Sequence, residues 1–169
     1  AYPEPVFDKE EAMRLQTYYL SSGKWFIGAA INNAGVVLKW LRDNIFNMPY
    51  EELTHEASKE DSSNLFFLPY LTGERDKEIG NIASGVFFGL KNTHNRGHMI
   101  RAAMEGVAFS LRMIYEALKD NNIKVKEIRA GGGATNSPLW MEIFASILGL
   151  PIKVSKVEEP ALVLSLIHI

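Results

Sequence analysis

The sequence predicts an α/β domain, in which helices and strands pack in layers. Strand-like and helix-like segments alternate through the second half of the chain, a pattern typical of helices that cover a sheet. The 169 residues are 47% hydrophobic and 22% charged, which supplies enough apolar material for a core and argues against disorder. The composition therefore indicates one globular domain.

The first half is predicted to open with a β-hairpin. Residues 15–20 and 25–31 are rich in β-branched and aromatic side chains and flank a Ser-Ser-Gly turn. A helix should follow, with Asn32 or Asn33 as its cap. Its apolar positions recur at three- and four-residue steps: Val37, Leu38, Leu41 and Ile45.

The rest of the chain alternates between elements of both kinds. The longest predicted helix covers residues 96–119, where apolar side chains keep a helical period for about six turns. The remaining predictions are a polar helix at 50–59, a buried strand ending at 69, a loop at 71–84, strands at 85–90, 125–130 and 151–156, and a helix at 137–148 that Gly149 ends.

Charge and cysteine content exclude several functions. The net charge is −2 and the basic residues are scattered, so no field gathers nucleic acid or an anionic membrane. The chain has no cysteine, which excludes disulfides and thiolate metal sites and is compatible with a reducing cytoplasm. No apolar run has the length of a membrane span. Small molecules or proteins are the expected partners.

Residues 131–133 are three consecutive glycines between an expected strand and an expected helix. Because glycine loses the most backbone entropy on folding, a turn that orders three of them uses their missing side chains. A strand, a tight turn and a helix beginning near Ser137 would direct backbone N–H groups at one point, which suits an anion or a nucleotide. A close turn without a ligand explains the glycines about equally well. The spacing matches neither a P-loop nor a dinucleotide-binding motif.

Four segments, in order, resemble the FGGY carbohydrate kinases. GGGATNSPLWMEIFASILGLPI (131–152) is similar to that family's adenosine-binding stretch, and GVFFGLKNTHNRGHMIRAAMEGVAFSLR (85–112) to its recognition pattern. FLPYLTGER (67–75) and INNAGVVLKWLRD (31–43) resemble its intervening segments. The resemblance implies an ATP-dependent sugar kinase of the actin/hexokinase-like (ribonuclease H-like) fold, with this chain as a truncated C-terminal half.

The resemblance also implies a nucleotide site. The residues expected to bind the nucleotide are Gly35, Lys39, Gly132, Gly133, Asn136 and Ser137. Gly132 and Gly133 match glycines whose backbone approaches the phosphates, and Asn136 and Ser137 stand where the family places a polar side chain near the adenosine. The implied cofactors are ATP and Mg²⁺.

Two of these positions have an equally good structural explanation. Gly35 and Lys39 match positions that line the pocket from the helix before WLRD, but Gly35 also fits helix packing and Lys39 fits a solvated surface. Trp40 and Trp140 are predicted to be core aromatics.

No catalytic residue and no metal ligand are assigned in this chain, since in the family the sugar site and the catalytic aspartate belong to the N-terminal domain. Glu105 is expected to be structural. His94 and His98 lie four residues apart, but no third ligand is expected to join them. Glu74 and Arg75 are predicted to anchor a loop near the cleft by an ion pair.

Two segments depart from the family pattern. DKEIGNIAS (76–84) lacks the expected proline and tryptophan, which puts the geometry of that loop in question. VLSLIHI (163–169) replaces a helix of small residues, so we expect a domain at 1–162 and a truncated or foreign tail at 163–169.

The resulting hypothesis is the ATP-binding domain of a cytoplasmic sugar kinase, with gluconate as the first candidate substrate. The alternatives are a xylulose kinase and a non-catalytic nucleotide-binding or scaffold module of the same fold. The expected partners are a sugar or sugar acid, the missing N-terminal domain and a second copy in a possible homodimer.

Overall fold

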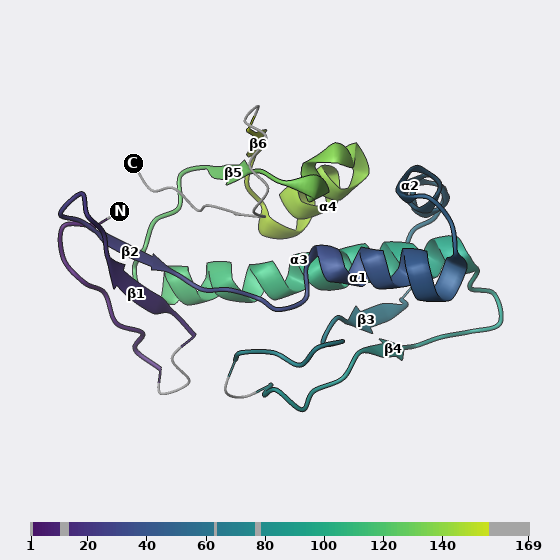
Figure 1. Ribbon diagram of the computed structural model, residues 1–169, viewed down its shortest axis with the longest axis horizontal. Helices are drawn as coiled ribbons and strands as arrows, with labels where there is room; N and C mark the ends of the chain where they lie inside the picture. Colours follow the sequence, from purple (N-terminus) through teal and green to yellow (C-terminus); the bar gives the residue numbers. More distant parts are fainter. Residues whose placement is uncertain (1, 11–13, 63, 77–78, 156–169) are drawn as a thin grey trace.

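The computed structural model describes residues 2–10, 14–62, 64–76 and 79–155. Helix α3 (Arg96–Asp120) is its central axis, and the other elements lie around it (Figure 1). The elements in chain order are β1 (Gln16–Tyr19), β2 (Trp25–Gly28), α1 (Gly35–Trp40), the π-helix η1 (Leu41–Phe46), α2 (Tyr50–Ser58), β3 (Phe66–Leu68), β4 (Val86–Phe88), α3, β5 (Ile128–Ala130), the 3₁₀ helix η2 (Gly133–Asn136), α4 (Pro138–Leu148) and β6 (Ile152–Val154).

Helix α3 forms where the sequence predicts it, because its capping residues and its buried apolar face both match the sequence pattern. At its start the Asn95 side chain accepts a hydrogen bond from the His98 backbone (3.2 Å), and the His98 ring accepts one from the Asn95 backbone (3.3 Å). Helices α1, α2 and α4 and strand β3 all contact α3. The fully buried side chains of α3 at this junction include Ile100, Ala103, Met104, Val107 and Ala108.

Gly106 and the hydrogen bonds of two side chains, Trp140 and Arg112, set how closely α3 packs. A Cβ placed on Gly106 would lie 2.2 Å from the Phe67 carbonyl oxygen, so β3 reaches the backbone of α3 itself. The indole of Trp140 donates to the Met104 carbonyl (3.1 Å), which satisfies its one polar atom inside the core. Arg112 donates to the carbonyls of residues 147 and 148 at the end of α4, where a cation is favourable.

Within the described ranges, the strands form three separate pairs. β1 and β2 are the predicted hairpin, and Gly23 in its turn has φ of +75°. β3 and β4 are antiparallel, with Phe66 opposite Phe88. β5 and β6 are parallel, and α4 supplies the crossover that a parallel pair requires. The strands are shorter than predicted, at three or four residues each.

The predicted cap of the helix after β2 is wrong. α1 begins after Ala34 without a side-chain cap. Asn33 is fully buried instead, donating to the Gly73 carbonyl (2.7 Å) and accepting from the Thr72 backbone N–H (3.1 Å). A long-range use of this amide therefore replaces the local use that its position predicted.

The same helix also changes its winding. It continues from α1 as the π-helix η1 and ends at Asn47, whose φ of 49° is left-handed. A π-helix bonds residue i to i+5, which shifts the angular position of later side chains. Ile45, predicted to lie on the apolar face, is consequently 45% exposed. The predicted tail at 163–169 lies outside the described residues.

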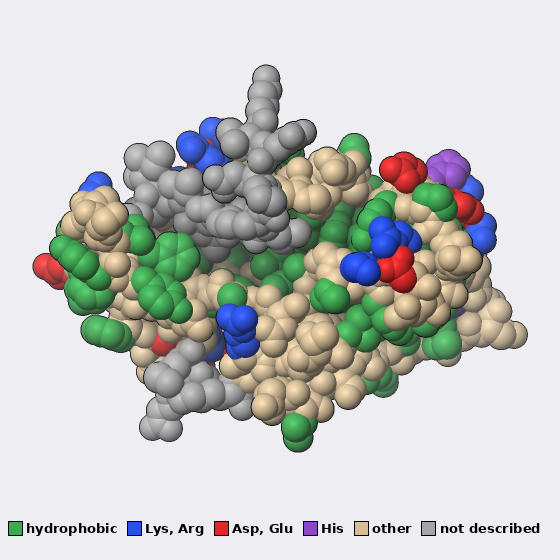
Figure 2. Space-filling view, in the orientation of Figure 1, with side chains coloured by type: hydrophobic (Ala, Val, Ile, Leu, Met, Phe, Trp, Pro, Cys, Tyr) green, Lys and Arg blue, Asp and Glu red, His purple; other side chains and the backbone are tan. Residues whose placement is uncertain are grey.

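Hydrophobic side chains gather over the β1–β2 hairpin, at the left of Figure 2. Tyr18, Tyr19 and Phe26 are exposed there, while Leu15 and Ile27 pack against the end of α3 in a second, smaller core. No helix of the described residues has the length and apolar character needed to cross a membrane.

A buried ionic cluster ties the N-terminal segment to the end of α3. The Asp8 side chain is only 1% exposed and accepts hydrogen bonds from Arg14 (3.3 Å) and from the Asn121 amide (2.9 Å). Burial raises the pKa of this carboxyl, but the hydrogen bonds from Arg14 and Asn121 outweigh it and hold the pKa at about 2.

Replacing Asp8 by asparagine is expected to lower the free energy of unfolding by about 2 kcal/mol at pH 7, since a depressed carboxyl pKa stabilises the folded state above its unfolded value near 4. That stabilisation is lost as the pH falls from about 4 towards 2, so the two proteins should converge in acid. Urea unfolding across this range measures it.

Asp120→Asn is the matched control. Asp120 pairs with the same arginine at 3.1 Å, but its side chain is 52% exposed, so its loss should cost less than about 1 kcal/mol. Equal losses for the two variants, or a loss at Asp8 that does not change with pH, would contradict this account.

Candidate functional site

A cavity of about 290 Å³ lies where α1, α2, η2 and α4 meet. Its volume is at the lower end of the range typical of small-molecule sites. The residues that line it are Gly35, Leu38, Tyr50, Glu51, Thr54, Gly133, Ala134, Asn136, Ser137 and Trp140. One end is thus formed by the glycine turn and the other by the first turns of α2.

The glycine turn has two positions with different reasons for being glycine. Gly132 has φ of 83°, a conformation that other residues rarely adopt. Gly133 has no such constraint, and a Cβ built on it would meet no atom of the described residues within 4 Å. The described part of the chain therefore leaves room for a side chain at Gly133, on the wall of the cavity.

The backbone of this turn offers hydrogen-bond donors. Thr135 folds back on the turn, since its backbone N–H and its hydroxyl both donate to the Gly132 carbonyl (3.1 and 2.7 Å). The N–H groups of Gly132 and Gly133 have no acceptor within the part of the chain that the structure describes. Free N–H groups on a glycine turn before a helix suit an anionic group.

The wall from α4 is fixed by its cap. The Ser137 hydroxyl accepts a hydrogen bond from the Trp140 backbone (3.2 Å), and Pro138 occupies the first position of the helix, where its missing N–H costs nothing. Ser137 and Trp140 are both buried, with Trp140 3% exposed. Their positions are therefore set before any ligand binds.

The opposite wall comes from the first turns of α2. Pro49 precedes the helix, and Tyr50 begins it with 39% of its surface exposed. The Arg42 guanidinium lies 4.5 Å from the centre of the Tyr50 ring, a cation–π contact that holds the ring in place. Glu51 is exposed and lies next to it in the lining.

The structure brings together four of the predicted site residues: Gly35, Gly133, Asn136 and Ser137. The other two lie outside the cavity lining. Gly132 directly precedes it and shapes the turn. The Lys39 side chain is 62% exposed and pairs with Asp43 at 2.8 Å, and basic and acidic side chains lie together over the end of α1 in Figure 2. A role for Lys39 in nucleotide binding stays a prediction.

Sequence reasoning missed the contribution of α2 to this cavity. The segment 50–59 was predicted to be a polar helix, and that prediction is confirmed. An aromatic and a carboxylate directly after Pro49 were the only local feature that could have indicated a binding wall. Trp140 was predicted to be a core residue, which its burial confirms, yet it also reaches the cavity.

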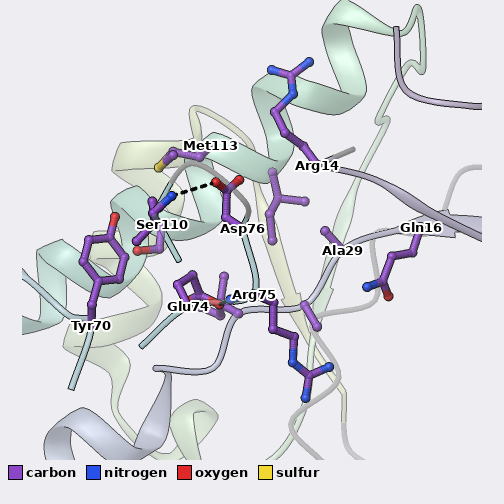
Figure 3. Close-up of a pocket in the computed structure, with 13 residues that line it drawn as sticks. Arg14, Gln16, Ala29, Tyr70, Glu74, Arg75, Asp76, Ser110 and Met113 are labelled. Atoms are coloured by element: carbon purple, nitrogen blue, oxygen red, sulfur yellow. Dashed lines mark hydrogen bonds between the residues drawn. The ribbon is translucent and has the colours of Figure 1, made fainter. Parts of the chain in front are cut away.

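A second cavity of about 80 Å³ lies beside α3 and the β1–β2 hairpin (Figure 3). Asp76 lies beside Ser110 and Met113 in Figure 3 and accepts a hydrogen bond from the Ile79 backbone (3.2 Å). Burial, and then the charges of Glu74 and Asp76, raise the pKa of Tyr70 in the same wall.

The predicted ion pair between Glu74 and Arg75 is wrong, although both residues do anchor the loop. The buried Glu74 carboxylate accepts from the backbone N–H groups of Asn32 (3.0 Å) and Arg75 (2.8 Å). The Arg75 guanidinium donates to the Asn32 side chain (2.8 Å). Asn32 is thus the common partner, because its backbone and its amide offer both a donor and an acceptor.

His94 and His98 lie at the start of α3, which begins between them as predicted. Each ring accepts a backbone hydrogen bond, from Lys91 (3.1 Å) and from Asn95 (3.3 Å). The His98 ring also lies 3.4 Å from Glu60. Within the described ranges, no three histidine, aspartate or glutamate side chains converge as metal ligands.

Known proteins with a similar sequence or structure are sugar kinases. The gluconokinase of Bacillus licheniformis is 35% identical in an alignment 172 residues long, gaps included, which covers 92% of this chain and 34% of that protein. A ligand-bound xylulose kinase and a gluconate kinase, both from Lactobacillus acidophilus, superpose with TM-scores of 0.83 and 0.82 at 30% identity, covering 94% of this chain and 32% of each of those chains.

These matches identify the fold of the chain and show how much of its relatives' length it spans. The structural neighbours share the actin/hexokinase-like fold, which confirms the predicted fold class. The chain spans about a third of the length of these relatives. The family described as "FGGY family of carbohydrate kinases, C-terminal domain" matches residues 2–163. The chain, with its glycine turn and adjoining cavity, therefore belongs to the FGGY family of carbohydrate kinases.

Proposed function

We propose that this chain is the nucleotide-binding half of a kinase that transfers the γ-phosphate of MgATP to a hydroxyl of a sugar or sugar acid. The observation that carries the proposal is the cavity, which joins the open wall at Gly133 to Asn136, Ser137 and Gly35. A glycine that the protein's own packing does not require is what a ligand's close approach requires.

The phosphates belong at the glycine end of this cavity. Gly133 lines that end, and neither its N–H nor that of Gly132 directly before it has an acceptor among the described residues. Glu51 lines the cavity from α2, and its negative charge would repel the phosphates. The nucleoside would then extend between α1 and α2, over the apolar surface of Leu38 and Trp140. Magnesium would enter with the nucleotide and supply positive charge to the transferring phosphate.

Gluconate is the proposed acceptor, with xylulose as the alternative. This choice follows from the similarity of the chain to gluconokinases and to a gluconate kinase. Phosphoryl transfer needs the acceptor hydroxyl held in line with the γ-phosphate and a carboxylate to take its proton. We assign those two tasks to an N-terminal domain. We also propose that the whole enzyme is a cytoplasmic homodimer.

The experiment is an assay of ADP release by the polypeptide that joins this chain to such a domain. MgATP is supplied with gluconate, xylulose, ribulose or glycerol, and a Gly133→Val variant is assayed in parallel. Turnover with gluconate that the variant loses supports the proposal. Turnover with xylulose alone would favour the xylulose kinase, and nucleotide binding without any turnover would favour the non-catalytic module.

A further inference from the structure

We infer that Glu51 accepts a hydrogen bond from the 6-amino group of the bound purine and so selects an adenine nucleotide. The inference rests on the nucleotide site proposed above and assigns the base-reading residue within it. It comes from three features of the cavity: an unused carboxylate, the distribution of charge, and an aromatic ring beside that carboxylate.

The polar side chains of the cavity wall differ in whether the protein already uses them. Ser137 caps α4, and the Thr54 hydroxyl donates to the Glu51 carbonyl (3.0 Å). The Glu51 carboxylate and the Asn136 amide, by contrast, form no hydrogen bond or ion pair within the described part of the chain. Groups of this kind in a cavity wall are the ones available to a ligand's donors and acceptors.

The charge of Glu51 determines which part of a nucleotide can lie next to it. A carboxylate accepts hydrogen bonds and donates none, so phosphate oxygens are repelled. The glycine turn, whose N–H groups at 132 and 133 have no acceptor among the described residues, takes the phosphates instead. The uncharged nucleoside end therefore faces Glu51.

The neighbour of Glu51 favours the base over the ribose. Arg42 holds the Tyr50 ring at the cavity wall while leaving 39% of that residue exposed. An exposed aromatic ring offers a stacking surface to a planar base, and ribose has no such surface. Stacking on Tyr50 would bring the edge of the base towards the adjacent carboxylate.

The chemistry of that edge then sets the choice of base. Adenine presents the N6 amino group as a donor, which a carboxylate accepts, whereas a 6-oxo purine presents an acceptor oxygen at the same place. A charge-assisted hydrogen bond at a partly exposed position is expected to contribute roughly tenfold in affinity. Glu51 is thus a specificity-determining residue, with no part in the transfer step.

The test is a cycle that removes each partner of this hydrogen bond in turn. The full chain, as wild type and as Glu51→Ala, is titrated calorimetrically with ADP and with purine riboside 5′-diphosphate, which lacks only the 6-amino group. The wild-type chain should bind ADP roughly tenfold more tightly than purine riboside 5′-diphosphate, and Glu51→Ala should bind the two ligands equally. Glu52→Ala is the control, because Glu52 lies on the same turn of α2 but outside the cavity lining. The ratio of its affinities for ADP and for purine riboside 5′-diphosphate should equal the wild-type ratio.

The alternatives give different results. Independent, additive effects of the two deletions would overturn the inference. Coupling of Glu51 to the 2′-hydroxyl, measured with 2′-deoxy-ADP, would also overturn it and assign the carboxylate to the ribose. If wild type binds none of these nucleotides, the proposed function itself fails, which is distinct from nucleotide binding that does not depend on Glu51.

Discussion

Gly106→Ala is expected to lower the free energy of unfolding by about 3 kcal/mol, because it overpacks the contact between α3 and β3. The added Cβ would lie 2.2 Å from the Phe67 carbonyl oxygen, a backbone atom that cannot rotate away. Alanine is the better helix former by about 1 kcal/mol, so an isolated helix would gain stability from the same change. A loss of stability would therefore show that tertiary packing outweighs helix propensity at this position. Chemical denaturation measures the change in the free energy of unfolding.

Met113→Ala provides the comparison for this substitution. Met113 lies on the same helix, about two turns later, and is 50% exposed, so its truncation should change stability by less than about 1 kcal/mol. A Gly106→Ala protein as stable as wild type would show that β3 does not lie against the backbone of α3.

Gly133→Val is expected to weaken ADP binding at least tenfold, because a branched side chain occupies cavity volume that the ligand needs. The protein should tolerate the change, since no atom of the described residues lies within 4 Å of the added Cβ and φ is not left-handed. The melting temperature should accordingly stay close to that of wild type while the dissociation constant from calorimetry rises.

Gly131→Ala is the matched control within the same turn. Of the residues that the structure describes, a Cβ there would meet Ser155 alone, at 4.0 Å, and Gly131 lies outside the cavity lining. This variant should bind ADP as wild type does. Equal loss of affinity in both variants would point to general disturbance of the turn. Unchanged affinity in Gly133→Val would show that ADP does not bind in this cavity.

Much of the fold is predictable because local pattern and tertiary packing agree. The apolar period of α3 matches its buried face, and the cap at Ser137 and the stop at Gly149 delimit α4 as its sequence indicates. Prediction fails where a side chain has a distant partner. Asn33 suits a helix cap, but it is buried against residues 72 and 73, and no local pattern contains that contact.

The candidate site likewise has one part that local sequence predicts and one part that depends on tertiary packing. Its glycine end is predictable from a short stretch of sequence, because the turn at 131–133 and the start of α4 are consecutive. Its other wall depends on how α2 packs against α3, which places Tyr50 and Glu51 about 80 residues away along the chain from the glycines that they face across the cavity.

The most direct test of the nucleotide site is a titration of the ¹⁵N-labelled chain with ADP, followed by amide chemical shifts. We expect the largest shifts at Gly133–Asn136 and in the first turns of α2, and small shifts beside the second cavity near Asp76. Shifts concentrated near Asp76, or no shifts in a folded protein at millimolar ADP, would contradict this expectation.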